Sequence, residues 1–232
     1  MNMSSRNNVI QTLSILAGLL ITAAFAMVLF YAPIELNMGL VQKVFYFHMA
    51  AAWVGMLAFL GAVIFAIQYL RTRDLKWDYF EASSIEIGLI FTMVCNFSGM
   101  IWAKAAWNTW WTWDPRLTTT TIMAFTYIAY LLLRRGVDDP QKRAQFGAIY
   151  AIIGFATVPL VFFSARLLRT IHPVLFGTGA GMEMNLTPEM LHTMIVSVIA
   201  FSVLYVAVLL FRQKLMTNQE TLKEAHQMDE EN

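Results

Sequence analysis

Charged side chains are scarce in this sequence: Asp, Glu, Lys and Arg make up only 13% of its 232 residues, about half of the roughly 25% typical of soluble domains. Hydrophobic residues make up 58%. This composition excludes a disordered protein and argues against an ordinary soluble globule. The 16 Lys and Arg nearly balance the 15 Asp and Glu, so no excess of positive charge supports binding to nucleic acid.

Cysteine is nearly absent as well. The one cysteine, Cys95, cannot form an internal disulfide, and the chain has no CxxC pair that would indicate a redox site or a zinc site. The sequence therefore gives no sign of a disulfide-stapled fold.

The hydrophobic residues are gathered into six blocks without Asp, Glu, Lys or Arg, each close to the roughly 20 residues that cross a bilayer as a helix. A charge at the centre of a lipid-facing helix costs about 2.5 to 3.5 kcal/mol, which explains why such blocks exclude it. With helical turns added to the two shortest blocks, we expect spans at residues 9–33, 44–70, 83–103, 115–133, 144–165 and 190–211. The sequence therefore predicts an all-α integral membrane protein, with residues 1–232 forming a single domain of six transmembrane helices.

The two ends of the chain fit the same interpretation. The first apolar run is longer than the roughly 7 to 15 residues of a signal-peptide core, so we expect an uncleaved span. Residues 212–232 are rich in Glu, Gln and Lys, and we expect them to form a helical or frayed cytoplasmic tail.

Lys and Arg are distributed unequally between the two sides of the membrane. Eleven lie on the side of both termini, and five lie in the three connecting segments of the other side, at residues 34–43, 104–116 and 166–189. Because cytoplasmic loops carry the excess of Lys and Arg, this count places both termini in the cytoplasm. The three connecting segments are then expected to share the outer face.

Five of the seven tryptophans fall within twelve positions around the outer segment 104–116. They are Trp102, Trp107, Trp110, Trp111 and Trp113. Tryptophan often forms a belt at the membrane interface, but a belt is spread over all helix ends, whereas these residues gather in one loop. Large rings on a short loop predict a flat apolar platform for a planar ligand or a partner protein.

The tryptophan-rich loop closes with Asp114 and Pro115. Asp followed by Pro is typical of the first residues of a helix, with the carboxylate as the N-cap. Asp114 therefore has two interpretations, a cap of the fourth helix and a part of the platform, and the two are compatible.

Two histidines are expected on the same outer face, although 124 positions separate them. His48 lies near the start of the second span, and His172 lies in the segment after the fifth. A lone histidine is most often a hydrogen-bonded bystander, but two beside an aromatic platform fit the axial ligands of a haem iron. Arg166 and Arg169 share a face if the fifth helix continues outward, where they would clamp a haem propionate or simply extend to the interface.

The run from Trp102 to Thr120, WAKAAWNTWWTWDPRLTTT, resembles the WWD signature of the haem-handling proteins of cytochrome c maturation. Together with YFHMAAAW (46–53), LRTIHP (168–173) and the six spans, it makes nearly the whole chain similar to the CcmC, or haem exporter protein C, family. Asn108 and Ala105 depart from the glycine and proline common in that family. Asparagine tolerates left-handed backbone angles, so the turn is expected to survive.

The resemblance implies a function that the composition does not show. It implies that the chain binds haem b at the outer face of the bacterial cytoplasmic (inner) membrane and delivers it to the haem chaperone CcmE, without enzymatic activity of its own. The implied partners are the ABC transporter subunits CcmA and CcmB, whose ATPase releases the loaded chaperone, and the small membrane protein CcmD. By motif, His48 and His172 match the axial ligands. The residues that match the platform are Trp107, Trp110, Trp111, Trp113, Asp114 and Arg116, preceded by Trp102.

Two other classes of function stay open at this point. A haem-using membrane enzyme, such as a cytochrome c haem lyase or a quinol oxidoreductase, would need further histidines for a second haem, and His192 is the only extra candidate near the outer face. A subunit that moves haem across the membrane would need a polar path and an energy source, and the chain has no nucleotide-binding motif. A purely structural subunit would not need paired outer histidines.

Overall fold

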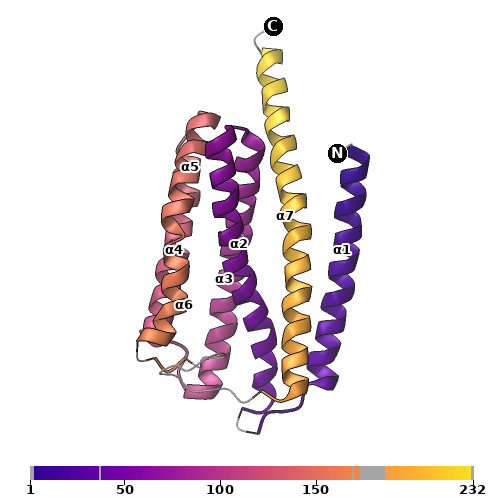
Figure 1. Ribbon diagram of the computed structural model, residues 1–232, viewed down its shortest axis with the longest axis vertical. Coiled ribbons are helices and arrows are strands. Elements are labelled where there is room, and N and C mark those ends of the chain that lie inside the picture. Colours follow the sequence, from indigo (N-terminus) through magenta and orange to yellow (C-terminus); the bar gives the residue numbers. More distant parts are fainter. Residues whose placement is uncertain (1–2, 37, 169, 173–185, 231–232) are drawn as a thin grey trace.

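A computed structural model describes residues 3–36, 38–168, 170–172 and 186–230 as a bundle of long helices (Figure 1). Six of the described helical segments are long and apolar enough to cross a membrane. The helices are α1 (Met3–Ala26, extended by the π-helical turn Met27–Tyr31), α2 (Val44–Thr72), α3 (Leu75–Trp107), α4 (Pro115–Arg135), α5 (Pro140–Gly154), α6 (Thr157–Leu167) and α7 (Pro188–Glu230). The predicted all-α fold with six transmembrane helices is therefore confirmed.

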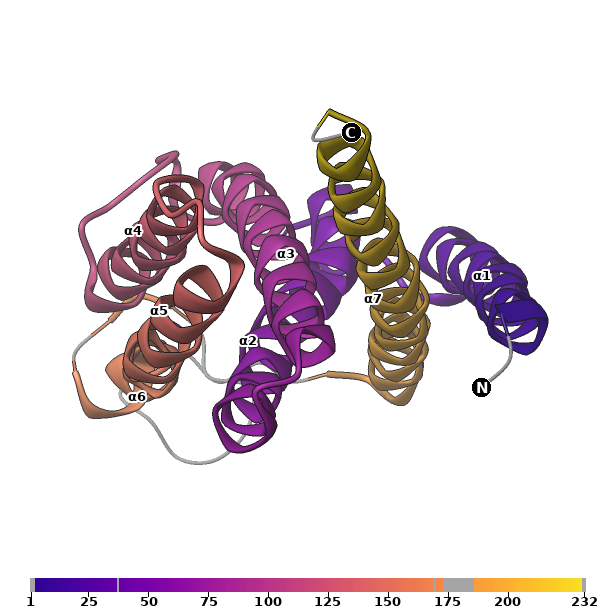
Figure 2. The ribbon, with the colours of Figure 1, turned by 90° about the horizontal axis from the view of Figure 1, so that it is seen from above.

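The two ends of the bundle differ in what they carry. Figure 1 shows the start of α1 and the end of α7 at one end, and the α3–α4 connection at the other. In Figure 2, α2 and α3 occupy the centre, with α1 and α7 on one side and α4, α5 and α6 on the other. The described parts of the three segments predicted for the outer face thus lie together, and their position outside the cytoplasm stays a prediction.

The fifth span is broken, which differs from the single helix expected over 144–165. Helix α5 ends at Gly154 and α6 begins at Thr157. Pro159 lacks the N–H that would bond to the carbonyl of Phe155, and its ring crowds that carbonyl. The amide of Val158 instead donates to Phe155 O at 2.9 Å, a tighter turn.

The outer end of the fifth span lies just beyond the expected residue 165 and before Arg169. Helix α6 ends at Leu167, and Leu168 is extended, with φ −114° and ψ 152°. The shared face of Arg166 and Arg169 was expected only if the helix continued outward beyond this point. Arg169 lies outside the described residues, so this pairing stays a prediction.

The central helices pack closely around a small group of interhelical hydrogen bonds. Ser84 on α3 donates to Ala58 O on α2 at 2.6 Å, and its hydroxyl lies 2.8 Å from Tyr205 Oη on α7. A Cβ at Gly61 would lie 2.7 Å from the same Tyr205 oxygen. Small residues and interhelical hydrogen bonds hold helices together in lipid, where the hydrophobic effect between them is absent.

Two ion pairs join helices inside the bundle, toward the end that carries the termini. Asp78 on α3 accepts two hydrogen bonds from Arg134 on α4. Glu86 on α3 accepts from Arg212 on α7, with Nε to Oε2 at 2.6 Å. These ion pairs join α4 and α7 to α3, at the end of the bundle opposite to the α3–α4 connection.

Candidate functional site

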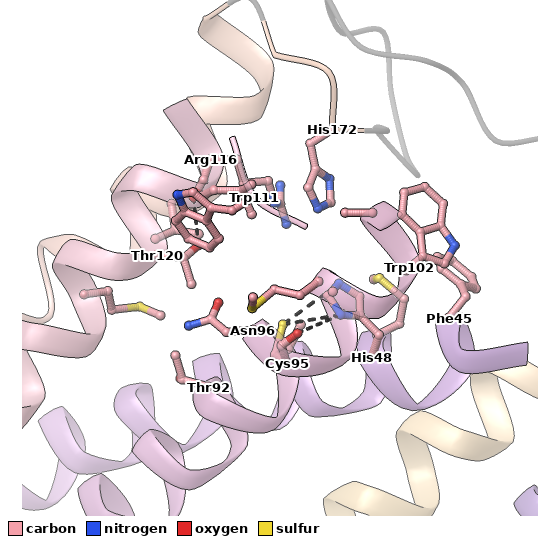
Figure 3. Close-up of a pocket in the computed structure, with 18 of the residues that line it drawn as sticks. Phe45, His48, Thr92, Cys95, Asn96, Trp102, Trp111, Arg116, Thr120 and His172 are labelled. Atoms are coloured by element: carbon pink, nitrogen blue, oxygen red, sulfur yellow. Dashed lines mark hydrogen bonds between the residues drawn. The ribbon is translucent and has the colours of Figure 1, made fainter. Parts of the chain in front are cut away.

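A pocket opens at the end of the bundle away from the termini, between α2, α3, α4 and the segment after α6 (Figure 3). Both predicted histidines line it, and in Figure 3 His172 enters from one side and His48 from the other. The predicted site residues that line this pocket are His48, His172, Trp102, Trp107, Trp110, Trp111 and Arg116. The fold thus brings together residues that lie 124 positions apart in the chain.

His48 projects from α2 and is fixed by the backbone of α3. Its Nδ1 lies 3.0 Å from the carbonyl oxygen of Cys95 and 3.2 Å from the hydroxyl of Ser98. A carbonyl oxygen only accepts hydrogen bonds, so Nδ1 carries the proton and Nε2 keeps its lone pair. A histidine that binds a metal is commonly held in this way through its other nitrogen.

Gly99 on α3 makes room for the imidazole of His48. A Cβ at this position would lie 2.9 Å from His48 Cε1 and 3.4 Å from Nδ1. The first of these distances is too short for real atoms, so any larger residue would push the ring away from its position. The glycine and the Cys95 carbonyl together determine where the ring sits, and neither was identified from the sequence.

The tryptophans form edge-to-face pairs instead of one flat surface. Trp102 is buried, packs against Trp107 at 5.1 Å between ring centroids, and has an interplanar angle of 86°. Trp107 in turn meets the ring of His172 at 6.4 Å. Trp111 and Trp113 form a second pair at 5.7 Å and 83°. Edge-to-face contacts of this kind are favourable, and they make an aromatic wall with its rings in several orientations.

Two of the tryptophans face outward from the pocket's mouth. Trp110 lines the pocket yet is 53% exposed, and Trp113 is 76% exposed and does not line it. Large exposed aromatic side chains next to a pocket are typical of a surface that another molecule covers. Some tryptophans of the loop therefore line the pocket, while Trp110 and Trp113 present exposed rings beside it.

Asp114 caps α4, as one of its two interpretations predicted. Its Oδ1 accepts from the amide of Leu117 at 3.0 Å, and Pro115 takes the first helical position. Its other oxygen, Oδ2, accepts a hydrogen bond from Thr170 Oγ1. Asp114 does not line the pocket, so within the described residues its contacts are to the helix and to the segment that carries His172.

Of the two described arginines named from the sequence, Arg116 lines the pocket and Arg166 does not, while Arg169 lies outside the described residues. The guanidinium of Arg116 forms no hydrogen bond or ion pair with any residue of the described ranges, and Figure 3 shows it beside Trp111. Arg166 lies over the ring of Phe162 at 3.9 Å and is not among the residues that line the pocket. A cation that lines an apolar pocket and is not engaged in a protein ion pair favours an anionic group on the ligand.

His192 has a structural contact outside the pocket. Its Nδ1 lies 3.2 Å from the hydroxyl of Tyr31, and the two rings stack with centroids 6.4 Å apart. This contact joins α7 to the π-helical end of α1. His192 is therefore a useful control for experiments on the two histidines of the pocket.

Comparison with known proteins gives consistent matches. A family model described as "CcmC: Heme exporter protein C" matches residues 1–228. A protein named heme exporter protein C from Bradyrhizobium diazoefficiens is 29% identical over 175 residues, which cover 75% of this chain and 66% of the relative. The protein of the same name from Escherichia coli K12 is 26% identical over 184 residues, covering 79% of this chain and 74% of the relative.

A mitochondrial relative extends the comparison to plants. A putative cytochrome c biosynthesis ccmC-like mitochondrial protein of Marchantia polymorpha is 29% identical over 141 residues, covering 61% of this chain and 59% of the relative. The chain thus spans slightly less than two thirds of the length of both the Bradyrhizobium and the Marchantia proteins.

Proposed function

Because the chain belongs to the CcmC, or heme exporter protein C, family, we propose that it binds haem in the pocket of His48 and His172 and hands it to the haem chaperone CcmE during cytochrome c maturation. The observation that carries this proposal is the meeting of these two histidines, from α2 and from the segment after α6, in a pocket lined by four tryptophans. Two imidazoles are a common axial ligand pair for haem iron.

The residues of the pocket suit the three chemical parts of haem. The lone pair on His48 Nε2 is available for iron because Nδ1 donates to the Cys95 carbonyl. The indoles of Trp107 and Trp111 offer apolar contact to a porphyrin ring. Arg116, which forms no hydrogen bond or ion pair with a described residue, supplies the charge for a propionate. Arg166 is a second candidate for this role, from the rim.

Presentation of haem, and not catalysis, is the task that this site supports. The pocket holds ligands for haem, while the exposed Trp110 and Trp113 lie beside its mouth, where an incoming chaperone would contact them. In this proposal the cargo is haem b, the pocket faces the outer side of the bacterial inner membrane, and both termini are cytoplasmic. CcmA, CcmB and CcmD are the proposed partners in the membrane.

Gly99→Ala is expected to weaken haem binding by about 10- to 100-fold, the usual effect of disturbing a residue that orients a metal ligand. The new methyl group would overlap His48 Cε1 and turn the ring. Titration of the purified variant with haem, followed by absorbance, measures the change. Gly18→Ala on α1 is the matched control, since its new Cβ would have no atom within 4 Å. Equal affinities for the two variants would contradict this role of Gly99.

Covalent haem on CcmE is the direct test of the proposed function. In cells that contain CcmE but lack their own CcmC, expression of this chain is expected to restore haem-loaded CcmE, detected by peroxidase staining after denaturing electrophoresis. A lyase-like enzyme would instead attach haem to an apocytochrome without CcmE. Haem-loaded cytochrome in the absence of CcmE, or no loading of CcmE despite normal membrane levels of the chain, would contradict the proposal.

A further inference from the structure

A short hydrogen-bonded link joins the tryptophan-rich loop to His172. The hydroxyl of Thr170 donates to Asp114 Oδ2 and accepts from the amide of His172, at 3.1 Å from N to Oγ1. The direction of both bonds is fixed by chemistry, because a carboxylate only accepts and an amide N–H only donates. Thr170 is buried, with 7% of its surface exposed, so these are the partners available to its hydroxyl.

The two pocket histidines are held by different kinds of structure. His48 sits within the long helix α2 and bonds to a backbone carbonyl of α3. His172 lies beyond the end of α6, and no helix includes it. A hydroxyl that accepts from an amide two residues later makes a compact local turn. The position of His172 relative to α4 therefore depends on the side chain of Thr170.

Asp114 anchors this link to a rigid element. Its Oδ1 is engaged by the Leu117 amide in the first turn of α4, where the positive end of the helix dipole also favours a carboxylate. Its Oδ2 is then directed to Thr170. One carboxylate thus joins the N-terminus of α4, the end of the tryptophan-rich loop and the segment that carries His172.

We propose that Thr170 is a positioning residue, which holds His172 in place for haem through Asp114. This inference rests on the proposed function of the pocket. It assigns Asp114 an indirect role, because its carboxylate acts on haem binding through Thr170.

Thr170→Val tests the link, since valine keeps the shape and loses the hydroxyl. In the haem-free protein, hydrogen–deuterium exchange at the amide of His172 is expected to accelerate at least about tenfold, because that amide loses its acceptor. In the haem-loaded protein, loss of haem to a competing haem-binding protein is expected to accelerate by about tenfold or more. Thr170→Ser retains the hydroxyl and is expected to restore both values toward the wild type.

Two further variants separate the link from general effects on folding. Thr126→Val on α4 removes a hydroxyl that donates only to Ile122 O of its own helix, and both rates are expected to match the wild type. Asp114→Asn keeps a good helix cap, but the nitrogen that replaces Oδ2 cannot accept the Thr170 proton, so exchange at His172 should rise while exchange in α4 stays slow.

The outcomes distinguish this inference from the proposed function. Wild-type exchange at His172 and wild-type haem loss in Thr170→Val would overturn the positioning role, even if haem binding by the pocket is established. Absence of haem from the wild-type protein would overturn the proposed function, while the exchange experiment, which needs no haem, would still measure the link. Failure of Thr170→Ser to restore slow exchange would also contradict the inference.

Discussion

Replacing His48 with alanine is expected to lower haem affinity at least about a hundredfold and to convert any remaining bound haem from a six-coordinate to a five-coordinate state. Loss of a ligand should exceed the 10- to 100-fold effects typical of residues that only orient one. His172→Ala is expected to act in the same direction. Absorbance spectra of the purified variants, recorded at equal protein concentration with added haem, measure both changes.

The control for the histidine variants is His192→Ala, which removes an imidazole from the same end of the bundle. His192 contacts Tyr31 and does not line the pocket, so its replacement is expected to leave the haem spectrum unchanged. The assignment of ligands would be contradicted if His48→Ala and His172→Ala both kept the wild-type spectrum. A changed spectrum in His192→Ala would point to a different ligand pair.

Changing Trp110 and Trp111 to alanine together is expected to reduce covalent loading of CcmE at least about tenfold. A tryptophan at the centre of a contact surface commonly contributes 2 kcal/mol or more to binding, which corresponds to about a 30-fold change in affinity. Trp110 is half exposed beside the mouth of the pocket, and Trp111 lines its wall. Quantified haem-loaded CcmE in cells that express each variant at equal level gives the result.

Trp53→Ala is the matched control for the loop. Trp53 lies on α2, is 45% exposed, donates through Nε1 to Ser202 at 3.1 Å, and does not line the pocket. Its replacement is expected to leave CcmE loading unchanged. If the Trp110 and Trp111 double variant loaded CcmE as well as the wild type, the loop would not be the surface that serves the chaperone.

The number and approximate position of the spans could be predicted from charge alone. Asp, Glu, Lys and Arg interrupt the apolar blocks, and each block became a membrane-spanning segment. Helix ends were less predictable. Helix α3 begins at Leu75, before the expected residue 83, with Asp74 as its N-cap, and the interior acid Asp78 is paired with Arg134 of α4. A charge count within one segment cannot show a partner that lies elsewhere in the sequence.

The two histidines of the site could be predicted from the sequence, but the residues that hold them in position could not. The order of the spans was enough to place His48 and His172 on one face, and the structure places both at one pocket. Thr170 was missed, although a hydroxyl two residues before a histidine is a signal for a local turn. The sequence contains no pattern that would identify Gly99 or the Cys95 carbonyl, since their contacts with His48 depend on how α2 packs against α3.

Predicting which arginine binds an anionic group of the ligand requires knowing where the helices end. Arg166 and Arg169 were paired on the assumption of a continuous helix, but α6 ends at Leu167. Arg116 was grouped with the tryptophan platform by its motif, and it lines the pocket without an ion pair to the described part of the chain. The end of a helix depends on local hydrogen bonding that a charge pattern does not report.

Electron paramagnetic resonance of the purified wild-type protein loaded with ferric haem tests the central claim most directly. Ligation by His48 and His172 predicts a low-spin ferric signal typical of two imidazoles, which becomes high-spin when either histidine is replaced by alanine. A high-spin signal in the wild type, or a low-spin signal that persists in both single variants, would contradict the pocket as the haem site.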